Sequence, residues 1–87
     1  MSYEYQKERE WIFTDHGQRM FLDVRDRVHH LLKQSGAVRM QEAISGVSGD
    51  SWRQLACVDR MVELGELIEL PQPSCAGQHR VFIARRA

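Results

Sequence analysis

The C-terminal third of the chain, residues 57–86, places the strongest constraint on the fold. It reads CVDRMVELGELIELPQPSCAGQHRVFIARR, the end of an amphipathic helix followed by two β-rich runs. Gly65 is a typical helix stop, because glycine adopts the left-handed backbone that ends a helix at little cost. Pro71 and Pro73 lack backbone donors, and Gly77 supplies turn freedom. We therefore predict a helix that leads directly into a β-hairpin with a long loop.

Length and composition indicate one small globular domain. A chain of 87 residues buries only about 60–65% of the surface that it exposes when unfolded, so a deep catalytic cleft is not expected. The hydrophobic fraction of 43% and the charged fraction of 28% are typical of an ordered, soluble protein. No apolar run approaches the roughly 18–20 residues of a membrane span, and the start MSYEYQKEREWIF has no signal-peptide-like stretch. These features predict a cytoplasmic protein.

A long helix is predicted in the first half of the chain. Phe21, Val24 and Val28 recur at spacings of three and four and form one apolar stripe. Asp15, or Thr14 as the alternative, can cap the first amides of this helix, with Gln18 three residues after Asp15 as in a capping box. The pair Ser35-Gly36 marks its end.

Two shorter elements and a third helix follow. Ala37-Val38 predicts a very short strand, and residues 40–44 predict a short helix that stops before Gly46. Residues 50–64 predict a helix with Ser48 or Asp50 as its cap and Gly65 as its stop. We expect the following side chains of this helix to point inward: Trp52, Leu55, Ala56, Val58 and Val62. The opposite face is predicted to expose Arg53, Gln54, Cys57 and Arg60.

The N-terminal residues 1–17 carry five large apolar side chains, which is a high load for a free tail: Tyr3, Tyr5, Trp11, Ile12 and Phe13. We predict a separate arm, either a strand or an irregular segment, with a helical turn as the alternative. The arm is expected to pack on the body of residues 18–87 or on a partner in a homodimer.

The charges are balanced over the whole chain but segregated along it. Twelve basic and twelve acidic residues give a net charge of zero. The net charge is −2 in residues 1–17, +2 in residues 18–47, −3 in residues 48–69 and +3 in residues 70–87. Neutrality is unfavourable for nonspecific nucleic-acid binding, although a segregated basic face would still permit it.

The order of helix, short strand, short helix, longer helix and hairpin resembles a winged helix-turn-helix domain. The resemblance covers about residues 18–86, and the runs LACVDRMVELGELIEL and RVFIAR carry it. It implies an α+β fold with a three-helix core and a two-stranded wing. It also implies that residues 50–64 are a recognition helix for the DNA major groove and that residues 71–80 form the wing.

The resemblance implies that the protein binds double-stranded DNA and acts as a transcriptional regulator. A homodimer on a palindromic site would be natural. Arginine and glutamine can make paired hydrogen bonds to guanine and adenine edges. The implied DNA-contacting residues are Ser51, Arg53, Gln54, Cys57, Arg60, Gln78, His79, Arg80, Arg85 and Arg86. The net negative charge of the third helix departs from this pattern, because acidic groups oppose phosphate binding.

Three other functions were weighed against DNA binding. A protein-interaction adaptor fits the neutral charge and the acidic third helix, with a docking surface around Trp11, Phe13 and the wing. Zinc binding would use Cys57, Cys75 and His79, but no CxxC pair is present, so no metal or other cofactor is expected. Catalysis is not expected either, since the chain has no phosphate-binding glycine loop and no nucleophile motif.

Overall fold

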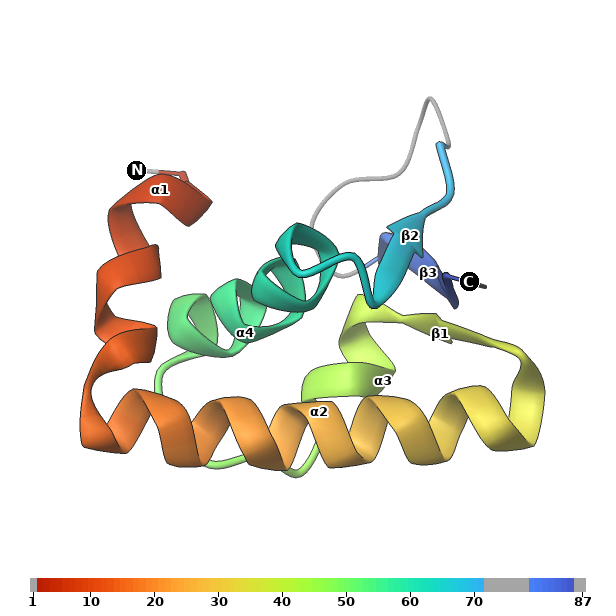
Figure 1. Cartoon of the computed structure of the whole chain (residues 1–87), viewed down its shortest axis with the longest axis horizontal. Helices are drawn as coiled ribbons and strands as arrows, with labels where there is room; N and C mark the ends of the chain where they lie inside the picture. Colours follow the sequence, from red (N-terminus) through yellow and green to blue (C-terminus); the bar gives the residue numbers. More distant parts are fainter. Residues whose placement is uncertain (1, 72–78, 86–87) are drawn as a thin grey trace.

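The computed structural model describes residues 2–71 and 79–85, and this part of the chain has an α+β fold (Figure 1). Four α-helices and one 3-10 helix pack with a three-stranded antiparallel sheet, which turns one face toward them. In chain order the elements are α1 (Tyr5–Glu8), η1 (Arg9–Phe13), α2 (Asp15–Ser35), β1 (Ala37–Arg39), α3 (Met40–Ile44), α4 (Ser51–Glu63), β2 (Leu67–Glu69) and β3 (Val81–Ala84). Within the described residues no helix is both long and apolar enough to cross a membrane.

Helix α2 is the longest element; its predicted stop at Gly36 is confirmed, and its cap is the alternative Thr14, with Asp15 as the first helical residue. The side chain of Thr14 accepts a hydrogen bond from the Gly17 amide and so caps the first turn. Gly36 closes the helix with a φ of 76°, a conformation that glycine adopts without steric cost. The predicted stripe of Phe21, Val24 and Val28 is buried.

The strands form one sheet in the order β1-β3-β2, so β3 lies between the two others. The short strand at Ala37-Val38 and both strands of the hairpin were predicted. Phe82 of β3 lies opposite Val38 of β1, and Leu67 of β2 lies opposite Ala84. Val38, Leu67 and Phe82 are buried and turn one face of the sheet toward the helices. The tip of the predicted loop, residues 72–78, lies outside the described residues.

Helix α4 begins and ends as predicted, but two of its side chains point differently. The Asp50 carboxylate accepts hydrogen bonds from the amides of Trp52 and Arg53. Gln54 and Cys57, which were expected on the exposed face, are buried instead. That expectation was wrong because the core-facing side of α4 is wide and because Gln54 can satisfy its amide inside the protein. Trp52, expected to be buried, is half-buried.

The N-terminal arm, residues 2–13, is helical from Tyr5 to Phe13. The predicted strand or irregular segment is therefore wrong, and the alternative of a helical turn is confirmed. Elements α1 and η1 stand against one end of α2 and contact α4 (Figure 1). Ile12 of η1 is fully buried in the common core. A side chain at Gly17 would collide with the carbonyl oxygen of Trp11, so glycine at this position lets η1 approach α2 closely. The arm is therefore an integral part of the folded body.

Candidate interaction surfaces

The residues predicted to contact DNA do not form one surface. Ser51, Arg53, His79 and Arg85 are exposed, whereas Arg60 and Arg80 are half-buried. Gln78 and Arg86 lie outside the described residues.

Gln54 and Cys57 belong to the interior of the protein. The Gln54 side-chain amide donates hydrogen bonds to the carbonyl oxygens of Val47 and Gly49, at 2.6 and 3.1 Å. It thereby holds the segment that leads into α4. Cys57 is fully buried, and burial raises the pKa of its thiol to about 12. Neither side chain is available to bind a nucleic acid on the surface of this structure.

Arg80 forms a hydrogen-bonded ion-pair cluster where β2 ends and β3 begins, at the loop end of the hairpin. Its guanidinium donates to both carboxylate oxygens of Asp59 on α4, at 2.7 and 3.3 Å, and to both oxygens of Glu69 on β2, at 2.9 and 2.8 Å. These hydrogen bonds, first those to Glu69, raise the pKa of Arg80 and lower that of Glu69. The hydroxyl of Tyr3 also donates to Asp59, at 2.6 Å. The arm, α4 and the hairpin thus meet at the single carboxylate of Asp59.

A second cluster forms around Glu63, one turn further along α4. The Tyr5 hydroxyl donates to its carboxylate at 2.7 Å, Arg60 donates at 2.6 Å, and Arg9 donates at 2.9 and 3.0 Å. These partners, first Tyr5 and then Arg60, lower the pKa of Glu63 to about 2. Burial and the bond to Glu63 raise the pKa of Tyr5 to about 12. Two of these three partners, Tyr5 and Arg9, come from the arm.

The arm therefore covers the face of α4 that was predicted to read DNA. Arg53, Ala56 and Arg60 are spaced by three and four residues, so they lie on one face of the helix. The guanidinium of Arg53 stacks on the ring of Trp11, with its central carbon 4.4 Å from the ring centroid, and that of Arg60 stacks on Phe13 at 5.0 Å. Ala56, between them, is fully buried. The arm thus covers this face around Ala56 and Arg60, whereas Arg53 at its start remains exposed.

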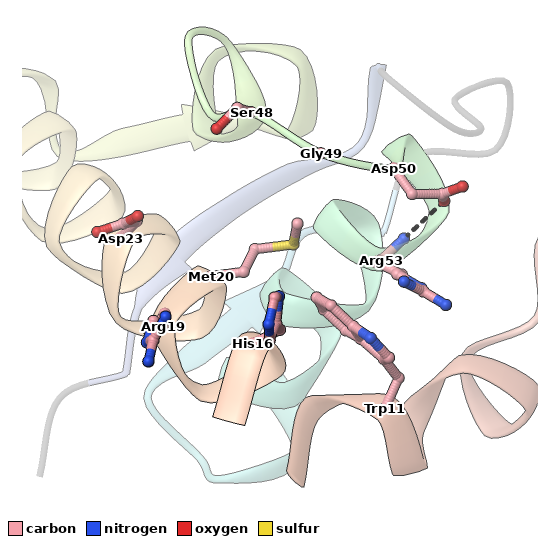
Figure 2. A pocket seen from close by; sticks show the side chains of 9 residues that line it. All are labelled: Trp11, His16, Arg19, Met20, Asp23, Ser48, Gly49, Asp50 and Arg53. Carbon is pink, nitrogen blue, oxygen red and sulfur yellow. Dashed lines mark hydrogen bonds between the residues drawn. The ribbon is translucent and has the colours of Figure 1, made fainter. Parts of the chain in front are cut away.

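An open cleft of about 480 Å³ lies beside the start of α4 (Figure 2). Its walls come from η1, the first turns of α2, the segment 48–50 and α4, and its lining includes His16, Arg19 and Arg53. Within residues 2–71 and 79–85, Arg19 and Arg53 form no ion pair. Asp50, also in the lining, is engaged as the cap of α4. The carboxylate of Asp23 lies in the same lining, so the cleft combines two guanidinium groups, two carboxylates and one imidazole.

The side of the sheet that faces away from the helices is apolar as well. We call it the outer sheet face. It is formed by five aliphatic residues: Ala37, Ile68, Leu70, Val81 and Ile83. Ile83 lies opposite both Ala37 and Ile68, so these three form a row across all three strands. Ile68 is 43% exposed, the other four are half-buried, and none of the five packs against the core.

One exposed arginine lies at each end of the outer sheet face, Arg39 at one end and Arg85 at the other. At one end Arg39 lies opposite Val81, and its amide donates to Glu42, whose carbonyl oxygen accepts a hydrogen bond from Arg27. At the other end the Arg85 amide donates to the carbonyl oxygen of Glu66, whose carboxylate is held by Arg25 at 2.8 Å.

A shallow hollow of about 460 Å³ adjoins the Arg39 end of this face. It is lined by Ala37, Val38, Arg39 and Val81, together with Ser35 and Glu42. A side chain of a binding partner could insert into this hollow at the Arg39 end of the sheet.

The outer sheet face was missed at the sequence level, although a signal for it was present. In the run LIEL, Leu67 points to the opposite side of the strand from Ile68 and Leu70, and all three are apolar. In the run VFI, Phe82 likewise points to the opposite side from Val81 and Ile83. Strands that are apolar on both sets of alternate positions are typical of sheets covered on both faces.

Comparisons of the chain with protein-family models, with curated proteins and with solved structures find no match.

Proposed function

We propose that this chain is a winged-helix protein-interaction module that docks a partner protein on its outer sheet face. The winged-helix interpretation is supported by the element order and by the antiparallel sheet order β1-β3-β2. Winged-helix domains serve both as DNA readers and as adaptors, so the choice depends on the surface.

The row of Ala37, Ile83 and Ile68 is the observation that carries the proposal. A contiguous apolar patch leaves hydrophobic surface in contact with water, and such patches mark interaction sites more often than isolated apolar residues do. Covering it with a partner recovers about 25 cal/mol for each Å² of apolar area removed from water.

The charge pattern of α4 supports the same choice. Arg60 and Arg80 are neutralised by Glu63, Asp59 and Glu69, and the arm occupies the face that a DNA groove would need. By contrast, Ile68 of the outer sheet face is 43% exposed, and its neighbours Ile83 and Leu70 are not part of the core.

Site-specific photo-crosslinking in the native cells would test this proposal. A photoreactive p-benzoylphenylalanine at position 68 should give one discrete protein adduct. The same group at position 22 is the matched control, because Leu22 is 52% exposed but lies on α2. The adduct should disappear when Val81→Lys is added in a variant that keeps the wild-type circular dichroism spectrum. An adduct that forms equally from position 22, or that survives Val81→Lys, would refute docking on this face.

DNA binding by the start of α4 is the second candidate. It is favoured by the cleft around His16, Arg19 and Arg53, because helix-turn-helix proteins contact base edges mainly with the first residues of the recognition helix. Titration of isotope-labelled protein with a mixed-sequence duplex would test it. Amide shifts at residues 16–20 and 48–53 that fade as salt rises would support DNA binding. Unchanged spectra at low salt would exclude a phosphate-binding surface there.

A further inference from the structure

The arginines at the two ends of the outer sheet face point to the chemistry of its partner. Arg39 and Arg85 are both exposed, and within the described residues neither forms an ion pair. Nearby, Arg25 of α2 neutralises the carboxylate of Glu66, so this glutamate does not offset the charge of Arg85. The face is thus apolar in the middle and positive at both ends.

We infer that the outer sheet face binds a protein segment in which aliphatic residues are flanked by acidic residues at both ends. This inference rests on the proposed function and specifies the partner. Aliphatic side chains of the segment would cover Ile68 and Ile83, and its carboxylates would reach Arg39 and Arg85. Complementary charge at the rim of an interface favours the correct partner and rejects like-charged competitors.

The spacing of the arginines limits the segment further. Arg39 lies beside Val81, and Arg85 is four residues further along the β3 direction, which corresponds to about 13 Å at the rise of a strand. Acidic residues four positions apart in an extended segment match this distance, as do residues about eight positions apart in a helix. A second copy of the chain fits less well, because its own outer sheet face would bring arginines against arginines.

Two synthetic peptides would test the inference. The first has aliphatic residues flanked by glutamates at the matching spacing, and the second carries lysines in place of the glutamates. Each is titrated into isotope-labelled full-length protein while amide shifts are followed at residues 37, 68, 70, 81 and 83. We expect the acidic peptide to bind at least about tenfold more tightly, since each opposed charge pair at the rim favours binding and each like pair opposes it.

The double variant R39E/R85E is the decisive control, because it should reverse the preference and favour the lysine peptide. Equal binding of both peptides, or no binding of either, would overturn the acidic partner. Shifts of the same residues with protein concentration alone would also overturn it, in favour of self-association. The proposed function fails separately: if position 68 gives a specific cellular adduct while the acidic peptide does not bind, docking on the face stands and only the partner chemistry is wrong.

Discussion

The variant Tyr3→Phe, which lacks one hydroxyl group, tests whether the hydrogen bond between the arm and α4 stabilises the protein in solution. The Tyr3 hydroxyl donates to Asp59 at 2.6 Å, and the Asp59 side chain is only 14% exposed. A hydrogen bond to a charged acceptor contributes about 1.5–3 kcal/mol. Because Asp59 keeps its bonds to Arg80, we expect a loss near the lower end, about 1.5–2 kcal/mol. For a chain of this size that corresponds to a fall in Tm of about 6–16 °C.

Urea and thermal unfolding followed by circular dichroism would measure this loss. Tyr5→Phe is the matched control, because its bond to Glu63 is exposed and Glu63 keeps Arg9 and Arg60 as partners. We expect the control to lose only about 0.5 kcal/mol. A double-mutant cycle of Tyr3→Phe with Asp59→Asn should give a coupling energy of about 1 kcal/mol. Equal stability of the two tyrosine variants, or full additivity in the cycle, would refute the bond between the arm and α4.

Three further predictions follow from the core and the ion pairs. Ile12→Ala should lower the free energy of unfolding by about 2–5 kcal/mol, as measured by urea denaturation. The exposed control Leu22→Ala should change it by less than about 0.5 kcal/mol. Similar losses in the two variants would mean that η1 is not part of the core. Because the pKa of Glu63 is lowered to about 2 from 4.5 when unfolded, its contribution to stability is complete above about pH 4.5 and is lost as the pH falls toward 2. Glu63→Gln should therefore flatten the decline in stability between pH 6 and pH 3, and an unchanged slope would contradict the lowered pKa. Cys57 should resist alkylation by iodoacetamide at pH 7.5, as mapped by mass spectrometry, until denaturant is added; labelling of the native protein at the rate of a free thiol would contradict its burial.

Much of the local structure of this protein was predictable because local interactions set it. The ends of α2 and α4 follow from the caps Thr14 and Asp50 and from the stop at Gly36, which act within one helical turn. The short strand at Ala37-Val38 and both strands of the hairpin follow from composition and turn residues. These signals occupy a few neighbouring positions, so the sequence alone determined the α+β class and the order of the elements.

The candidate surfaces depend on contacts between distant parts of the chain, which no local pattern encodes. Tyr3 and Asp59 are 56 positions apart, and Tyr5 and Glu63 are 58 apart. Helical periodicity shows that Arg53 and Arg60 share a face, but only the folded arm covers that face. The alternation of residues shows that Ile68 and Ile83 each lie on an apolar side of a strand. Only the strand register places them next to each other, on the sheet face that points away from the helices. The sequence by itself thus determined which elements form, and tertiary packing decided which of their faces remain available to a partner, because burial is set by whichever distant segment packs against each face.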